Sequence, residues 1–432
     1  MGLFKDRDLV IVKLQQMQEW LLIAYAISLP LSMTLSWALL TAGIIAWVVE
    51  SGIRHFVKVP HDHGPMVSTP LPLRVQVWLL VLAVALSGAP HTEAWNSVWS
   101  LKGMLIYFWA SKVFHFRPAI ARQALPVLLL ISGVAGVWGV IQYFFHLHWY
   151  YEQGTGFLSG PMAFAGQMQL FSTMALSLFL LKGHQRFGRV FENKWAWGGL
   201  VIANLLGLFA CDERSAWLGG LAGILIITAM HSWKTLLKSM VAVCLVGAVS
   251  YYSVPMVHNR VDATINYKAD VSTNSRFNMW KTAFVLWRDH PYFGAGWLKF
   301  PRIKDDKAIV PGKSVDLNHA HSNYLQFLGT TGIFGEIAYL WLLAGIVLVS
   351  IKSYVRAKVE KDSVAASVYA GALAGMVSLM VSGLFEFNFG TAQVRLAQWF
   401  ILALLSYEAI KAPNQEKGTG PKDTVPDSLP SV

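Results

Sequence analysis

The sequence predicts an all-α polytopic membrane protein with about twelve transmembrane helices and one large, partly helical loop before the tenth. Three observations support this class. Hydrophobic residues make up 55% of the 432 residues and charged residues 14%, whereas soluble domains carry about 25% charged residues. The apolar residues gather in runs close to the roughly 20 residues that a membrane helix needs. Lys and Arg are concentrated in every second connection between these runs, as they are in multi-pass proteins.

Twelve apolar segments qualify as candidate spans, and the first two are joined tightly around Pro30 and Ser32. They cover about 18–33, 35–50, 74–90, 99–115, 122–145, 161–181, 195–211, 216–231, 236–254, 323–350, 364–385 and 392–410. This divides the chain into spans one to nine (1–254), a large loop (255–321), spans ten to twelve (322–410) and a tail (411–432). The tail is rich in Gly, Pro, Lys, Asp and Ser, so we expect it to be disordered.

The positive charges predict that both termini are cytoplasmic. With the N-terminus inside, every inside connection carries Lys or Arg, whereas 91–98, 146–160 and 385–390 carry none. Excess Lys and Arg mark cytoplasmic loops. The net charge of +11 is therefore explained by the cytoplasmic connections of a membrane protein, and we expect no nucleic-acid partner. Two charged features fall outside this rule and lie on the outer side, namely the turn 212–215 and the loop 255–321.

The outer loop contains a predicted amphipathic helix over 275–287. Phe277, Trp280, Phe284 and Trp287 recur at helical spacing. Either Asn274 or Ser275 can cap its start, and Pro291 follows its end. We expect this helix to lie on the membrane surface or on the spans.

Two arginines are candidate anion ligands. Arg276 falls in the first turn of the predicted helix, where a cation opposes the helix dipole unless an anion is bound there. The alternative is a solvated surface arginine. Arg214 lies at the junction of two spans, where a charge is costly and often functional. The alternative is a local salt bridge with Asp212 or Glu213.

His321 is the candidate general base. It precedes the tenth predicted span, where the helix dipole disfavours imidazolium, and a neutral ring can take a proton from a hydroxyl group. His319, two residues earlier, points elsewhere if the segment is regular, and we expect it to play a supporting role. A structural histidine or a metal pair are the alternatives. No carboxylate or cysteine set lies near in sequence, so we expect no metal.

A base, anion-binding arginines and a membrane setting together predict one reaction class. A hydroxyl group attacks the anomeric carbon of a sugar carried on a lipid diphosphate, and arginine stabilises the departing diphosphate. A single displacement inverts the anomeric configuration. The spans provide a groove for the lipid.

At these residues the chain resembles the O-antigen ligase family and its polymerase relatives. The matching motifs are Arg214-Ser215, Ser275-Arg276-x-x-Met279-Trp280, His290-Pro291-x-x-Gly294-x-Gly296 and His319-x-His321-Ser322-x-x-Leu325-Gln326 with Gly332-x-x-Gly335. A common family variant has Asn where Ser322 stands. The resemblance implies a GT-C-like fold in the bacterial inner membrane. It also implies transfer of O-antigen from undecaprenyl diphosphate to lipid A–core at the periplasmic face, without metal or cofactor.

In that family the essential histidine corresponds to His321 and the essential arginines to Arg214 and Arg276. We name five weaker supporting or substrate-binding candidates: His319, Asn323, Tyr324, Arg288 and Glu386. Glu386, at the outer end of the eleventh span, can orient a histidine or bind a sugar hydroxyl group. The expected partners are the undecaprenyl-diphosphate donor, the lipid A–core acceptor and membrane lipids.

Three alternatives stay open at this point. An O-antigen polymerase and a protein O-oligosaccharyltransferase belong to the same superfamily. A transporter of the lipid-linked glycan is disfavoured. Transporters concentrate charge at mid-membrane in broken helices, whereas the unusual charges of this chain lie in the outer loop and in the turn 212–215.

Overall fold

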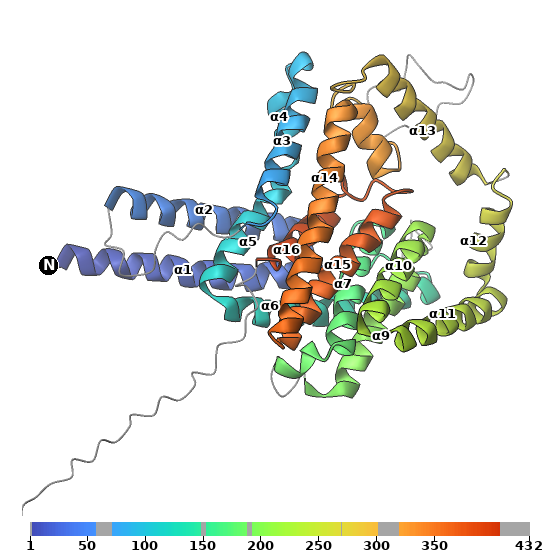
Figure 1. Ribbon diagram of the computed structural model, residues 1–432, viewed down its shortest axis with the longest axis horizontal. Coiled ribbons are helices and arrows are strands. Elements are labelled where there is room, and N and C mark those ends of the chain that lie inside the picture. Colours follow the sequence, from blue (N-terminus) through green and yellow to red (C-terminus); the bar gives the residue numbers. More distant parts are fainter. Residues whose placement is uncertain are drawn as a thin grey trace, which may run out of the picture.

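The computed structural model describes residues 2–57, 71–147, 153–187, 192–268, 270–300 and 319–406 (Figure 1). Within these ranges every regular element is a helix and no strand occurs, so the predicted all-α class is confirmed. The tail expected to be disordered (411–432) and residues 301–318 of the outer loop lie outside the described residues.

Each predicted apolar segment overlaps a helix. These helices are α1 (Gly2–Ser28), α2 (Met33–Val57), α3 (Arg74–Gly88), α5 (Leu105–Phe116), α6 (Pro118–Phe145), α7 (Pro161–Leu180), α9 (Lys194–Ala210), α10 (Arg214–His231), α11 (Trp233–Ser253), α14 (Asn323–Val359), α15 (Ser363–Ser382) and α16 (Ala392–Ala403). Among the described residues, 7 helices are long and apolar enough to cross a membrane: α2, α3, α6, α7, α11, α14 and α15. The protein is therefore polytopic, and the count of twelve spans stays a prediction.

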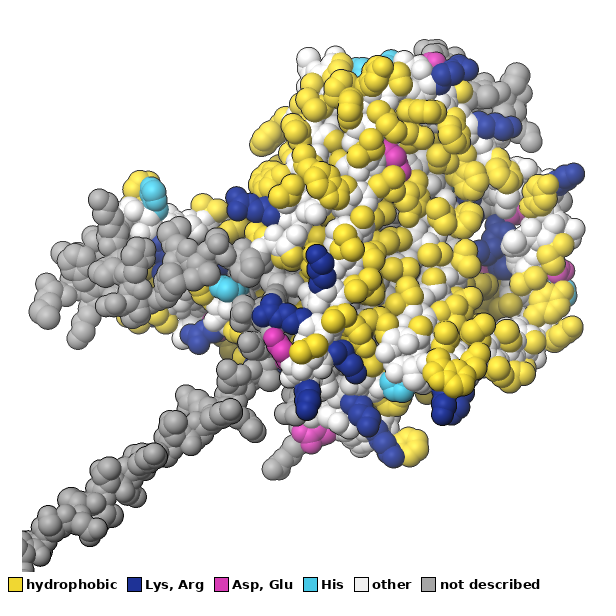
Figure 2. Space-filling model, viewed as in Figure 1, with side chains coloured by type: hydrophobic (Ala, Val, Ile, Leu, Met, Phe, Trp, Pro, Cys, Tyr) yellow, Lys and Arg dark blue, Asp and Glu magenta, His cyan; other side chains and the backbone are white. Residues whose placement is uncertain are grey.

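Helices α7 and α15 form the buried centre of the bundle, and α10 and α14 pack against α15. The contact between α10 and α15 is close because α10 carries Gly219. A Cβ added there would lie 2.3 Å from the carbonyl oxygen of Ser378. Small residues allow such approaches between membrane helices. Figure 2 shows hydrophobic side chains over most of one face, with Lys and Arg gathered mainly toward its margins.

The outer loop forms two helices, α12 (Pro255–Ile265) and α13 (Val271–Asp289). Together with α11 they rise along one side of the molecule and meet the top of α14 (Figure 1). Met279, Ala283 and Leu286 of α13 are buried in a small apolar cluster with Phe300 and Ala320. The predicted amphipathic helix is therefore present, and it packs on α14.

The predicted start of this helix is wrong by one turn. Asp270 caps α13, and its carboxylate accepts a hydrogen bond from the backbone N–H of Thr273 at 3.3 Å. A carboxylate is a strong cap and adds a favourable charge at the helix N-terminus. Arg276 consequently lies in the second turn rather than the first. The argument that an anion at this helix terminus explains Arg276 no longer holds.

Helix α14 is broken at Gly332, whose φ of 67° and ψ of −166° are not helical. The segment after α13 fills the break. Ala295 and Gly296 donate backbone N–H groups to the carbonyls of Gly329 and Thr330, each at 3.0 Å. Ile333 in turn donates to the carbonyl of Pro291 at 2.9 Å. The motif from His290 to Gly296 is therefore joined by backbone hydrogen bonds to the segment around Gly332. These hydrogen bonds fix the first turns of α14, which follow His321.

Candidate active site

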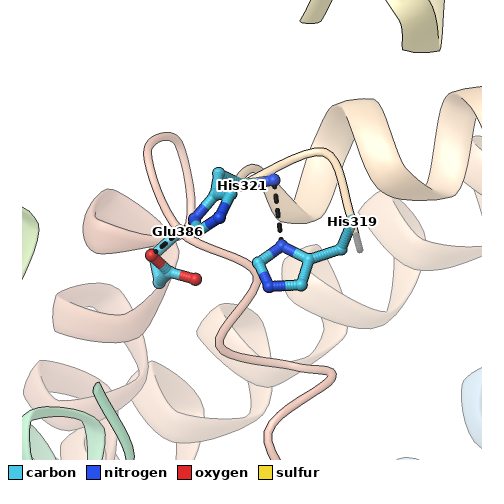
Figure 3. A group of neighbouring side chains, drawn as sticks. All are labelled: His319, His321 and Glu386. Carbon is cyan, nitrogen blue, oxygen red and sulfur yellow. Dashed lines mark hydrogen bonds and ion pairs between the residues drawn. The ribbon is translucent and has the colours of Figure 1, made fainter. Parts of the chain in front are cut away.

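His321 and Glu386 form the centre of the site. His321 lies directly before the N-cap residue of α14, and Glu386 lies between α15 and α16. The Nδ1 atom of His321 is 3.0 Å from Oε2 of Glu386 (Figure 3). Glu386 is buried. A carboxylate accepts hydrogen bonds, so it holds the ring proton on Nδ1 and leaves the Nε2 lone pair available.

The backbone aims the imidazole ring at this carboxylate. His321 has a φ of 45°, in the left-handed region, where residues other than glycine are strained by roughly 1–3 kcal/mol. The next residue, Ser322, caps α14 by accepting from the N–H of Leu325. Strain of this kind concentrates at functional sites, where the surrounding structure enforces it.

His319 lies beside His321 and does not point away, because the segment is not regular. The two ring centroids are 4.1 Å apart, and Nδ1 of His319 accepts a hydrogen bond from the backbone N–H of His321 at 3.2 Å (Figure 3). Burial and the neighbouring His321 lower the pKa of His319 to about 4. His319 is therefore neutral at pH 7 and supports the backbone of His321.

Asn323 joins the two chain segments that carry His321 and Glu386. Its backbone N–H donates to the Gly383 carbonyl at 2.7 Å, and its side chain donates to Asn388 Oδ1 at 2.7 Å and accepts from Phe389 N–H at 3.1 Å. All of its side-chain contacts are therefore internal. Although we named it as a supporting or substrate-binding candidate, the structure favours support.

Two other candidates lie apart from the centre. Tyr324 donates its hydroxyl to the Met380 carbonyl at 3.0 Å, which ties α14 to α15. Arg288 lies in the last turn of α13, is 75% exposed and pairs with Asp289 at 3.5 Å. The structure therefore does not bring Arg288 to His321.

Three arginines line one cavity of ≈ 630 Å³ beside this centre. Arg214 and Arg276 were predicted, whereas Arg260 of α12 was missed. The rest of the lining is largely apolar and aromatic and includes Trp217, Leu218, Ile265, Tyr267, Phe277, Trp280 and Phe385. A cationic region within an apolar cavity suits an anionic headgroup attached to a long apolar chain.

The arginine partners differ from the local pairing considered for the 212–215 turn. Arg214 donates to Asp270 at 2.8 Å and to Thr264 at 3.1 Å. Arg260 makes a bidentate pair with Asp212 at 2.9 and 2.8 Å. These two pairs hold the α9–α10 turn to α12 and the start of α13. No local sequence pattern distinguishes Arg260 from the other cations of the outer loop.

Arg276 connects the cavity to the histidine. Its guanidinium lies 3.9 Å from Glu386 Oε2, and no described residue comes within hydrogen-bonding distance of it. Burial raises the pKa of Glu386, but the hydrogen bond from His321 and the nearby Arg276 guanidinium help to hold it below its usual value. Glu386 is therefore a carboxylate at neutral pH, and within the described part of the chain most donors of Arg276 have no acceptor and can bind an anion.

Glu213 is a second acidic group that sequence reasoning did not select. It precedes α10 and lines a small cavity with Glu386 and Asn388. Burial, and then the neighbouring Glu386, raise the pKa of Glu213 to about 7. Two carboxylates that share one site in this way differ in protonation near neutral pH.

His319, His321 and Glu386 also offer ligand atoms within 4.8 Å of one another, so they are a group that could hold a metal ion. One observation counts against this use, because the Arg276 cation lies 3.9 Å from the carboxylate. A positive charge at that distance opposes the binding of a second cation.

Residues 199–340 match the family model described as O-Antigen ligase. The matched range runs from α9 into α14 and contains all three cavity arginines and both histidines, whereas Glu386 lies beyond it. The family resemblance predicted from the sequence motifs is therefore confirmed over this range. No curated protein matches the chain.

Proposed function

From the O-antigen ligase family match over residues 199–340, we propose that the protein transfers O-antigen from undecaprenyl diphosphate to a sugar hydroxyl group of lipid A–core. The reaction takes place at the periplasmic face of the bacterial inner membrane. One observation carries the proposal. A histidine is oriented by a buried carboxylate, and Arg276, which lies 3.9 Å from that carboxylate, lines a cavity together with two further arginines.

The transfer is a single displacement in which His321 acts as general base. The acceptor hydroxyl oxygen bonds to the anomeric carbon while the bond from that carbon to the diphosphate oxygen breaks. The hydroxyl proton moves to Nε2 of His321, and Glu386 stabilises the imidazolium that forms. The bonding electrons leave with the diphosphate. Attack from the side opposite the leaving group inverts the anomeric configuration.

The arginines stabilise the diphosphate charge that grows during this step. Among the described residues no hydrogen bond occupies the donors of Arg276, and Arg214 and Arg260, each paired with an aspartate, line the same cavity. Preorganised donors of this kind contribute roughly 2.7–4 kcal/mol each to transition-state stabilisation in other enzymes. The apolar and aromatic lining accommodates the first units of the polyprenyl chain, and no metal is required.

The decisive experiment is reconstitution of the purified full-length protein with a defined undecaprenyl-diphosphate glycan and lipid A–core. We expect transfer that persists in excess chelator. His321→Ala abolishes it and Arg276→Lys retains little, because the bidentate geometry of the guanidinium is lost. The matched controls are His258→Ala, at an exposed histidine, and Arg288→Lys, on the same helix as Arg276; both should keep near wild-type rates.

The outcomes separate the alternative functions. Transfer to a second donor molecule instead of lipid A–core indicates a polymerase, and transfer to a polypeptide indicates a protein glycosylation enzyme. Loss of activity in chelator supports metal binding at His319, His321 and Glu386. A protein that moves the donor across vesicles but forms no new glycosidic bond is a transporter.

A further inference from the structure

A second surface, separate from the arginine cavity, combines aromatic rings with a cation. We call Trp37, Trp95, Trp99 and Lys102 the tryptophan–lysine surface. Trp95 and Trp99 lie on α4 (Ala94–Ser100), with ring centroids 5.9 Å apart and planes at 17°. They are 73% and 53% exposed. Exposed indole rings offer apolar faces of the type that sugar rings cover.

Lys102 places a positive charge directly beside these rings. Its Nζ lies 4.9 Å from the centroid of Trp99 and 5.1 Å from that of Trp37. Among the described residues, no carboxylate pairs with it. Cation–π contacts hold the ammonium group in place but leave its charge available to an anion.

A second cation lies behind Lys102. Arg395 of α16 is only 7% exposed, and its Nε has no hydrogen-bond partner in the described part of the chain. A Cβ added at Gly103 would lie 3.4 Å from this Nε, so Arg395 packs against the residue that follows Lys102. A buried arginine without an anionic partner is costly and adds to the positive potential of the surface.

The tryptophan–lysine surface is physically connected to the candidate active site. The indole N–H of Trp297 donates to the hydroxyl of Ser100, on α4, at 2.8 Å. The Trp297 ring lies 6.0 Å from that of Phe387, and the Phe387 ring lies 5.6 Å from that of His319. This chain of contacts runs from α4 to the histidines.

The surface and the arginine cavity lie on opposite sides of α14 to α16. Helices α10, α12 and α13, which carry the cavity, lie on one side, and α2 to α5 lie on the other (Figure 1). A displacement with inversion needs the incoming hydroxyl group and the leaving diphosphate on opposite faces of the sugar. An acceptor held on the α4 side approaches the histidines from the side away from the arginine cavity, which is compatible with that requirement.

We propose that the tryptophan–lysine surface binds the acceptor as a phosphorylated glycolipid, with sugar rings on Trp95 and Trp99 and a phosphate on Lys102. This inference rests on the proposed transferase function and adds a site and a recognition chemistry for the acceptor. The predicted topology places the beginnings of α2, α5 and α16 at the outer side, where a lipid-anchored sugar is accessible.

The test measures acceptor and donor KM separately for nanodisc-embedded full-length protein. The probes are lipid A–core with its phosphates and the same lipid after enzymatic dephosphorylation. With the phosphorylated acceptor, Lys102→Ala should raise acceptor KM about tenfold or more, as expected for the loss of a charge-assisted contact. Donor KM and kcat should stay near wild type. With the dephosphorylated acceptor, wild type and Lys102→Ala should have similar KM values.

Further variants keep the test independent of folding. Lys102→Arg retains the charge and should stay within a few fold of wild type. The double variant Trp95→Ala, Trp99→Ala should raise KM for both acceptors. The matched control is Lys194→Ala with Trp195→Ala, a cation–π pair with a 5.2 Å separation at the start of α9, which should have no effect.

Three results overturn the proposal. The first is an unchanged acceptor KM in Lys102→Ala, and the second is an equal increase for both acceptors. The third is full competition by phosphatidylglycerol, which would make the surface a general membrane contact. If the wild-type protein shows no transfer at all, the proposed function fails. Direct binding of radiolabelled lipid A–core to wild type and Lys102→Ala then decides the surface proposal by itself.

Discussion

Glu386→Gln tests the catalytic geometry most directly, because it changes one charge and almost no volume. Glu386 is 7% exposed and its Oε2 accepts from His321 Nδ1 at 3.0 Å. A glutamine amide can rotate and donate to Nδ1. The ring proton then moves to Nε2, and the lone pair that takes the acceptor proton is lost.

Two losses set the size of the expected effect. A hydrogen bond to a charged group contributes about 1.5–3 kcal/mol, and the imidazolium formed during transfer loses its buried carboxylate. The equivalent carboxylate-to-amide change in a catalytic triad lowers kcat by roughly 10⁴-fold. We therefore expect kcat to fall between about 10² and 10⁴-fold, or about 2.7–5.4 kcal/mol.

The same substitution has an opposite effect on donor binding. Arg276 lies 3.9 Å from the Glu386 carboxylate, so removing that negative charge leaves the guanidinium freer for diphosphate. Donor KM should decrease while kcat falls. A variant that is merely misfolded would instead lose active protein without a change in KM.

The assay is steady-state transfer from a defined lipid-linked glycan to lipid A–core, normalised to folded protein by size-exclusion chromatography. Glu336→Gln is the matched control, since Glu336 is a partly buried glutamate on α14 outside the site. It should stay within threefold of wild type. A kcat of Glu386→Gln within threefold of wild type would refute the role assigned to the His321–Glu386 pair.

Three further predictions follow from other contacts. Arg260→Ala should raise donor KM about tenfold with unchanged acceptor KM, because it removes one cavity cation; equal increases in both would contradict this. Gly332→Ala should lower the melting temperature, since an added Cβ meets a carbonyl oxygen at 2.3 Å, whereas Gly198→Ala, with nothing within 4 Å, should not. The raised pKa of Glu213, about 7 against 4.5, means that wild-type stability falls as pH rises through that window. Glu213→Gln should therefore melt higher than wild type at pH 8, with a smaller difference near pH 5.

The helices could be predicted because each depends on local composition. Apolar runs of sufficient length form helices in lipid whatever they pack against, since every backbone polar group must be satisfied internally. The start of α13 was less predictable. Asn274 and Ser275 are acceptable caps, and only the ion pair of Asp270 with Arg214 at 2.8 Å shows why the cap lies earlier.

The arrangement of the site depends on contacts between distant residues and could be predicted only in part. His321, Arg214 and Arg276 stand out by position and by family motif. Glu386 comes 65 residues after His321, and no local pattern shows that the two side chains meet. Arg260 is one of many cations in the outer loop, and its bidentate contact with Asp212 distinguishes it only in three dimensions.

The break in α14 gives a physical reason for two glycine motifs that carry no chemistry themselves. A continuous helix would use the Gly329 and Thr330 carbonyls internally. The break at Gly332 frees them for Ala295 and Gly296, so the segment after α13 is locked to α14 by backbone hydrogen bonds. Arg276 lies on α13 and His321 directly before α14. The separation between the proposed diphosphate ligand and the proposed base is therefore set by this junction, and glycines at 294 and 332 are required because an added Cβ at either would meet backbone atoms at 2.3 Å.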